Sequence, residues 1–151
     1  IIEVGCGIGR MSEFIAQDFS EVLAIDISEE MIKQAKARLP EINNLQFVST
    51  DGLNYPFPDN YFDIAFSFIV FQHMPSKDAV KRNFQEISRV LKQNGLAKIQ
   101  VRGVAIKKGE WFFGPAFNLR DILVLIKGFK LKLIHHEGER EKYFWLWLQK
   151  I

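Results

Sequence analysis

The sequence is poor in cysteine, in long apolar runs and in net charge. Cys6 is the only cysteine among 151 residues, so no disulfide bond can form within the chain, which favours a reducing compartment such as the cytoplasm. The longest apolar run, residues 64–71, has eight residues including Ser67, too few to span a membrane. A net charge of +2 gives no strong indication of a nucleic-acid partner, because the short lysine clusters are typical of solvated faces.

The composition favours one folded domain over residues 1–151. Hydrophobic residues make up 48% of the chain, which includes 14 phenylalanines, enough for a sizeable core. No signal-peptide pattern is visible. The chain starts with Ile inside a predicted strand, so we expect a natural segment to precede that strand.

Predicted strands alternate with predicted helices, as in a parallel α/β sheet. Strands are expected at residues 1–4, 22–27, 45–49, 64–68 and 96–101, and helices at 10–19, 28–39, 76–93 and 118–127. Two last strands, 129–135 and 143–148, are joined only by a short polar segment. They must therefore be antiparallel, because a parallel pair needs a long crossover.

The apolar positions of each predicted helix mark the face expected to lie against the sheet. These positions are Met11, Phe14, Ile15 and Phe19; Met31, Ile32, Ala35 and Leu39; Val80, Phe84, Ile87 and Leu91; and Leu119, Ile122, Leu123 and Ile126. Ser28 and Ser76 are expected N-caps. Asn94 and Gly95 are expected to end the third helix.

The opening residues carry the strongest functional signal, a strand that runs directly into glycines at positions 5, 7 and 9. Glycines let a ligand approach the backbone, and the helix that follows offers free N–H groups to it. Dinucleotide-binding turns prefer a third glycine where this chain has Arg10. Asp26 ends the next strand, 17 residues after Gly9, where a carboxylate can accept both hydroxyls of a ribose.

These residues resemble the class I S-adenosylmethionine-dependent methyltransferases, of the small single-domain, type-11-like kind. Four further matches follow in order: residues 26–28 with Met31, residues 50–52, residues 62–63 leading into 71–73, and residues 89–92 before 94–95. The resemblance covers nearly the whole chain. It implies a Rossmann-like, doubly wound, mostly parallel seven-stranded sheet of order 3-2-1-4-5-7-6 with an antiparallel last strand.

The resemblance also implies S-adenosylmethionine as the cofactor and a set of residues that bind it. These are Glu3, Gly5, Cys6, Gly7, Gly9, Asp26, Ile27, Met31, Asp51, Gly52, Leu53, Ser67 and Phe68. The glycine turn would line the methionine part, and Glu3 would orient its ammonium group. A tight strand–helix turn alone is the alternative explanation for the glycines.

The adenosine half of the cofactor would meet the ends of the next strands. Asp26 would hold the ribose, although a helix-capping or surface carboxylate is the alternative. Ile27 and Met31 would pack on the adenine, or serve only as core. Asp51 would accept the adenine amino group while the backbone at Gly52 or Leu53 reads the ring edge; a plain Asp-Gly turn is the alternative. Ser67 and Phe68 end the fourth strand, beside the cofactor.

Four residues are candidates for contact with the methyl acceptor. His73 is a tentative catalytic base, a substrate contact or a core residue. Trp111, Phe112 and Phe113 lie in a long apolar connection that is expected either to cover the acceptor or to pack on the sheet. His135 and His136 have no clustered cysteine or carboxylate partners, so we expect no metal site.

The predicted function is methyl transfer from S-adenosylmethionine to an unidentified acceptor, with a small molecule favoured. Two alternatives remain open. One is a non-catalytic domain that binds S-adenosylmethionine. The other is a nicotinamide-dependent oxidoreductase, against which Arg10 and the terminal hairpin argue.

Overall fold

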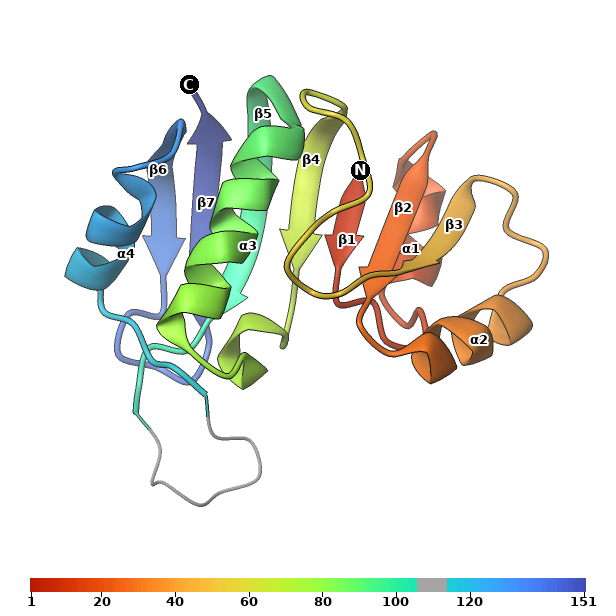
Figure 1. The fold of residues 1–151 in the computed structure, drawn as a ribbon, viewed down its shortest axis with the longest axis horizontal. Coiled ribbons are helices and arrows are strands. Elements are labelled where there is room, and N and C mark those ends of the chain that lie inside the picture. The colour runs from red at the N-terminus through yellow and green to blue at the C-terminus, as the bar shows by residue number, and fades with distance from the viewer. Residues whose placement is uncertain (106–113) are drawn as a thin grey trace.

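The computed structural model describes residues 1–105 and 114–151, which fold around one seven-stranded sheet (Figure 1). Its strands are β1 (Ile2–Val4), β2 (Val22–Asp26), β3 (Leu45–Ser49), β4 (Phe62–Ser67), β5 (Leu91–Val101), β6 (Leu131–Glu137) and β7 (Phe144–Lys150). The order is β3-β2-β1-β4-β5-β7-β6. Strands β1 to β5 are parallel, and β7 is antiparallel to both β5 and β6, which confirms the predicted order and hairpin.

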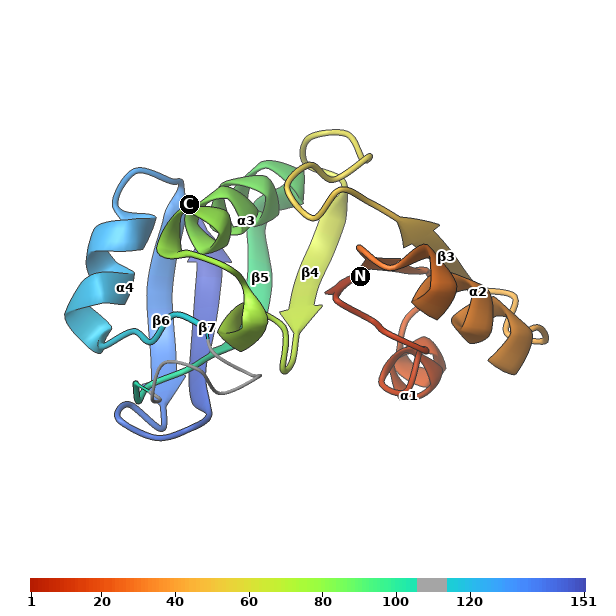
Figure 2. The ribbon, with the colours of Figure 1, turned by 60° about the horizontal axis from the view of Figure 1, so that its bottom comes forward.

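Four α-helices and one 3-10 turn accompany the sheet in the described ranges. They are α1 (Ser12–Asp18), α2 (Glu29–Arg38), α3 (Lys77–Val90), α4 (Leu119–Ile126) and the 3-10 turn η1 (Phe71–His73). Helices α3 and α4 cover β4, β5, β7 and β6 on one face, whereas α1 lies on the other side of the sheet (Figures 1 and 2). The carboxyl ends of β1, β2 and β4 therefore open at one edge, between the helices of the two faces.

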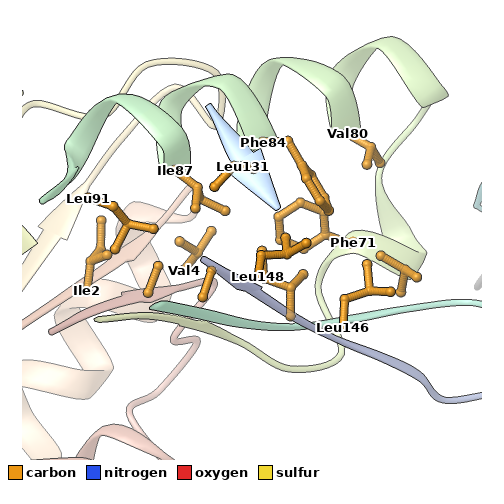
Figure 3. Close-up of a cluster of buried hydrophobic side chains, with 14 of the residues drawn as sticks. Ile2, Val4, Phe71, Val80, Phe84, Ile87, Leu91, Leu131, Leu146 and Leu148 are labelled. Carbon is orange, nitrogen blue, oxygen red and sulfur yellow. The ribbon is translucent and has the colours of Figure 1, made fainter. Parts of the chain in front are cut away.

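The main core lies between α3 and the sheet (Figure 3). Phe84 and Ile87 of α3 are fully buried against Ile2 and Val4 of β1 and against alternate residues of β7. Because side chains alternate along a strand, the residue between the two core positions of β1, Glu3, points to the opposite face. That face carries a smaller apolar cluster around α1 and α2.

Helices α2, α3 and α4 start where the sequence predicted, whereas α1 starts at Ser12, two residues after the predicted Arg10, and has no side-chain cap. Ser28 Oγ accepts a hydrogen bond from the Met31 backbone at 3.3 Å, and Ser76 Oγ accepts one from Ala79 at 3.1 Å. Asn118 and Asp121 form a reciprocal capping box at the start of α4. Each cap satisfies backbone N–H groups that have no partner within the helix.

The predicted end of α3 is wrong. The helix ends at Val90, and Leu91 is already extended and paired with Phe62 of β4. Asn94, with a φ of 66°, and Gly95 lie inside β5, where the pairing with β4 shifts register. The Asn-Gly pair therefore bends a strand instead of ending a helix.

Some positions predicted to face the sheet are exposed instead. Phe14 of α1 is 61% exposed, and Met11, directly before α1, is also at the surface, whereas Ser12 is buried. In α4, Leu123 is 48% exposed, and Ile122 and Ile126 form the buried face. Met31 of α2 is exposed as well.

Candidate functional site

A cavity of about 500 Å³ opens at the carboxyl edge of the sheet, within the size range of small-ligand sites. Segments that follow β1, β2, β3 and β4 line it, together with the first part of α3. The lining residues are Val4, Gly5, Ile25, Asp26, Ile27, Thr50, Asp51, Gly52, Leu53, Tyr55, Ile69, Val70, His73, Met74, Pro75, Ala79 and Asn83. Seven predicted site residues are among them: Gly5, Asp26, Ile27, Asp51, Gly52, Leu53 and His73.

Asp26 ties the glycine turn to the end of β2. Its Oδ2 accepts the Gly7 backbone N–H at 2.8 Å, and its Oδ1 accepts the Ser28 N–H at 2.9 Å. The Gly5 N–H donates to the Ile25 carbonyl at 2.7 Å. The carboxylate thus fixes the turn and the entry to α2 while lining the cavity, and each oxygen retains capacity to accept a further hydrogen bond.

The three glycines of the turn have different surroundings. All have positive φ, at 78° for Gly5, 54° for Gly7 and 79° for Gly9. A Cβ at Gly5 would lie 2.1 Å from the Val70 side chain, and one at Gly9 would lie 2.8 Å from the Phe47 ring, whereas one at Gly7 would meet nothing within 4 Å. Packing therefore requires glycine at two positions, and open space borders the third.

Glu3 lies beneath the turn and does not line the cavity. It is 4% exposed and accepts a hydrogen bond from Ser12 Oγ at 2.5 Å. Burial raises the pKa of Glu3 to about 7; the Ser12 hydrogen bond opposes this rise, and the negative charge of Asp26 adds to it. Sequence reasoning missed Ser12, the first residue of α1, because its contact with Glu3 joins residues nine positions apart.

Cys6 is a buried thiol between two glycines. Burial raises its pKa, and the nearby carboxylates of Glu3 and Asp26 raise it further. A protonated, buried thiol is a poor nucleophile, so Cys6 serves as a small side chain in the turn.

The loop after β3 is fixed by its own hydrogen bonds. Asp51 Oδ1 accepts the backbone N–H groups of Leu53 and Asn54 at 2.8 and 2.7 Å. The hydrogen bond from the Asn54 side chain, together with these two backbone bonds, lowers the pKa of Asp51. The Gly52 N–H donates to Thr50 Oγ1 at 3.2 Å. Both backbone donors that were expected to read an adenine edge therefore already have partners within the loop.

Side chains of α3 hold this loop from outside. Asn83 Nδ2 donates to the Gly52 carbonyl at 2.9 Å, and Asn83 Oδ1 accepts from the Tyr55 hydroxyl at 2.8 Å. Glu86 accepts the Tyr55 N–H at 2.9 Å and is paired with Arg89 at 2.7 Å. Sequence reasoning missed these contacts. The available signal was the polar character of Asn83 and Glu86 on the buried face of α3.

The segment after β4 forms the wall opposite Asp26. Val70 packs on Gly5, and η1 brings His73 to the cavity. Partial burial lowers the pKa of His73, and the positive charges of Arg102 and Lys142 lower it further. These effects favour the neutral form of the His73 ring.

Other predicted site residues lie away from the cavity. Ser67 is fully buried and donates to the Val4 carbonyl at 2.9 Å, which joins β4 to β1. Phe68 stacks on Trp145 of β7 at 5.2 Å between ring centroids. Met31, Cys6 and the two later glycines of the turn do not line the cavity. Trp111, Phe112 and Phe113 lie outside the described residues.

Residues 1–105 and 114–151 contain neither a membrane-spanning helix nor a metal-binding cluster. No helix in these ranges is both long and apolar enough to cross a membrane. No group of three or more His, Cys, Asp or Glu side chains in the same ranges is placed to hold a metal ion.

Comparison with known proteins gives a family match and several curated relatives. A family model described as a methyltransferase domain matches residues 2–99. The 2-methyl-6-phytyl-1,4-hydroquinone methyltransferase of Synechocystis sp. is 34% identical over 97 residues, covering 64% of this chain and 30% of that protein. Phosphoethanolamine N-methyltransferase 2 of Caenorhabditis elegans is 34% identical over 106 residues, covering 68% of this chain and 24% of that protein. The chain thus spans roughly a quarter to a third of these relatives.

The fold matches solved structures over almost the whole chain. An S-adenosylmethionine-dependent methyltransferase from Mesorhizobium loti superposes with a TM-score of 0.78 at 15% identity, covering 98% of this chain and 89% of the other. At that identity the likeness concerns the fold alone. Together, the family match and the fold imply S-adenosylmethionine as the cofactor.

Proposed function

The chain belongs to the methyltransferase domain family, and from that membership we propose that it transfers a methyl group from S-adenosylmethionine to a small-molecule acceptor, leaving S-adenosylhomocysteine. The observation that supports this most is the cavity shared by the glycine turn, Asp26 and the loop after β3. The domain over residues 1–151 is proposed to hold both cofactor and acceptor. The buried Cys6 thiol suits a cytoplasmic location.

The cavity residues fit an adenosine. Asp26 places a fixed carboxylate in a cavity with mostly apolar walls, where it can accept ribose hydroxyls. Ile27 and Leu53 are both exposed apolar side chains that line the same cavity, and the Ile27 side chain lies against Gly52. Apolar walls of this kind suit a flat adenine ring. The open space at Gly7 and the buried acid Glu3 suit the methionine part and its ammonium group.

S-adenosylmethionine, when bound, supplies a methyl group on a sulfonium that needs no further activation. The residues of this chain therefore have to position and desolvate the reactants. Well-held reactants can gain about 7–11 kcal/mol in such a reaction. Asp26 and the loop held by Asn83 would fix the adenosine, and Val70, Met74 and Pro75 would exclude water from the opposite wall.

The nature of the acceptor is proposed only as a class. The names of the two curated relatives mention a phytyl hydroquinone and phosphoethanolamine, which differ in both size and charge. A cavity of about 500 Å³ suits a cofactor with a small or slender acceptor. His73, on the wall opposite Asp26, is the described residue that we assign to the acceptor side.

Calorimetric titration with S-adenosylhomocysteine tests the proposal. We expect binding in the micromolar range, about −8 kcal/mol, and no comparable heat with NAD. Binding of NAD without a response to S-adenosylhomocysteine would instead support an oxidoreductase. A second assay, release of S-adenosylhomocysteine with a panel of acceptors, separates an active enzyme from a domain that only binds the cofactor.

A further inference from the structure

A line of amide groups connects the backbone of the β4–η1 segment to the ring of His73. The Ile69 N–H donates to Gln100 Oε1 at 3.0 Å, and Gln100 Nε2 donates to Gln72 Oε1 at 3.2 Å. Gln72 Nε2 then lies 3.1 Å from His73 Nε2. Gln72 and Gln100 are both buried, so water does not compete freely for these bonds.

The direction of every bond in this line follows from its first member. A backbone N–H can only donate, so the Gln100 atom that meets Ile69 is the oxygen and the other is the nitrogen. The carbonyl of Val101, which can only accept, contacts the same Gln100 nitrogen and fixes the same orientation independently. Gln72 must then present its oxygen to Gln100 and its nitrogen to His73.

The hydrogen bond between Gln72 and His73 determines the tautomer of the His73 ring. Gln72 Nε2 carries only protons to donate, so His73 Nε2 must accept with its lone pair. A neutral imidazole with a lone pair on Nε2 carries its proton on Nδ1. Free histidine in water favours the other tautomer, with the proton on Nε2, so the protein must impose this state.

We propose that Gln72 and Gln100 are positioning residues that hold His73 as the neutral Nδ1–H tautomer, with Nε2 committed to the Gln72 amide. Burial and the charges of Arg102 and Lys142 act in the same sense, because they lower the pKa of His73. The neighbouring groups thus favour the neutral ring, and the amide line selects one of its two neutral forms.

This assignment has a consequence for the reaction, which rests on the proposed methyl transfer. An acceptor proton can move onto Nε2 only after the bond to Gln72 breaks, so His73 does not serve as a general base through that nitrogen. The acceptors that suit such a site are already nucleophilic, such as an ionised oxygen or a neutral amine. Acceptors that need a proton removed from a weak acid would transfer slowly here.

The tautomer itself can be measured by nitrogen-15 NMR of the full chain without any ligand. Protonated and unprotonated ring nitrogens give well-separated signals, and His73→Asn identifies which of the three histidines is observed. We expect the unprotonated signal at Nε2 and the protonated one at Nδ1. A proton on Nε2, or an equal mixture of the two tautomers, would overturn the proposal.

Two variants of Gln72 test whether its side-chain amide determines the tautomer of His73. Gln72→Glu keeps the acceptor for Gln100 but removes the donor, so the proton should move to His73 Nε2 and the pKa of His73 should rise. Gln72→Met removes both hydrogen bonds and should also let the Nε2–H form appear, which keeps the test available if the first variant fails to fold. Gln46→Glu, at an exposed position of β3, makes the same charge change away from His73 and should leave its tautomer unaltered.

The experiment also separates this inference from the proposed function. If S-adenosylhomocysteine does not bind but the tautomer is as expected and changes in the Gln72 variants, the positioning role stands and the function fails. If the cofactor product binds but His73 keeps the same tautomer in both Gln72 variants, the function stands and the positioning role is refuted.

Discussion

Glu3 offers a direct test of how the buried side of the glycine turn affects stability. The side chain is 4% exposed, and its pKa is raised from 4.5 to about 7 because burial disfavours the charged carboxylate. Replacing Glu3 by Gln keeps the shape and an oxygen that can accept from Ser12 but removes the ionisable group. We therefore expect Glu3→Gln to stabilise the protein at high pH.

The magnitude and its sign follow from proton linkage. Below pH 4.5 both the folded and the unfolded chain carry the proton, and no penalty exists. Between pH 4.5 and about 7 the unfolded chain has lost a proton that folded Glu3 keeps, so the free energy of unfolding falls by up to 1.36 kcal/mol per pH unit. Above pH 7 the free energy of unfolding has fallen by its full amount, about 3 kcal/mol, whereas at pH 5 it has fallen by less than about 1 kcal/mol.

Urea unfolding of wild type and Glu3→Gln at pH 5 and pH 8 measures this effect. The free energy of unfolding of the variant minus that of wild type should rise by about 2 kcal/mol from pH 5 to pH 8. This rise does not depend on any pH-independent effect of the substitution. Glu41→Gln, at an exposed position, should show no such growth. If the difference between wild type and Glu3→Gln is the same at both pH values, Glu3 is not a buried acid with a raised pKa.

Cofactor binding should have the opposite pH dependence. An ammonium group near Glu3 favours the ionised carboxylate, so wild-type affinity for S-adenosylhomocysteine should rise between pH 6 and pH 8. Glu3→Gln should remove most of that rise. Equal pH dependence in the two proteins would show that the ammonium is bound elsewhere.

Three further predictions concern the walls of the cavity. Asp26→Ala removes two hydrogen bonds to a charged acceptor and should lower the free energy of unfolding by about 2 kcal/mol or more. The same change should weaken S-adenosylhomocysteine binding at least about tenfold. Unchanged values in urea unfolding and calorimetry would contradict this. Asn83→Leu leaves the Gly52 carbonyl without its α3 partner and should cost about 1–3 kcal/mol in the same unfolding assay. Gly9→Ala should lower the melting temperature more than Gly7→Ala, whereas Gly7→Ala should weaken S-adenosylhomocysteine binding more than its effect on stability explains.

The strand order and the terminal hairpin could be predicted from the sequence because local sequence patterns determine most of the topology. The polar connector between β6 and β7 is too short for a helix, which already requires an antiparallel pair. The end of α3 was not accessible, since Asn94 and Gly95 end helices in most contexts. Here Leu91 pairs with Phe62 of β4 and is extended, so the helix ends before it. This pairing depends on a distant strand, which local sequence patterns do not include.

The site was accessible in part for the same reason. Asp26 and the glycine turn are signalled by order along the chain, and both reach one edge of the sheet because the parallel strands end there. Val70 and Asn83 depend on how η1 and α3 pack against segments about 30 or more residues away, as the 31-residue separation of Asn83 from Gly52 illustrates. Local sequence patterns do not predict such contacts. The one local indication is that Asn83 is a polar residue on the apolar face of α3.

The glycine turn shows why a motif and a binding site are not the same thing. Gly5 is required by the Val70 side chain and Gly9 by the Phe47 ring, so the protein needs both whether or not a ligand binds. Substitutions at these two positions report on folding first, and lost activity there says little about contact with the cofactor. Gly7 differs because its surroundings are open and its N–H is held by Asp26, the residue proposed to bind the ribose. A Cβ at Gly7 still strains the backbone, because its φ is 54°. Among the three glycines, a loss of binding larger than the loss of stability explains is therefore expected at Gly7.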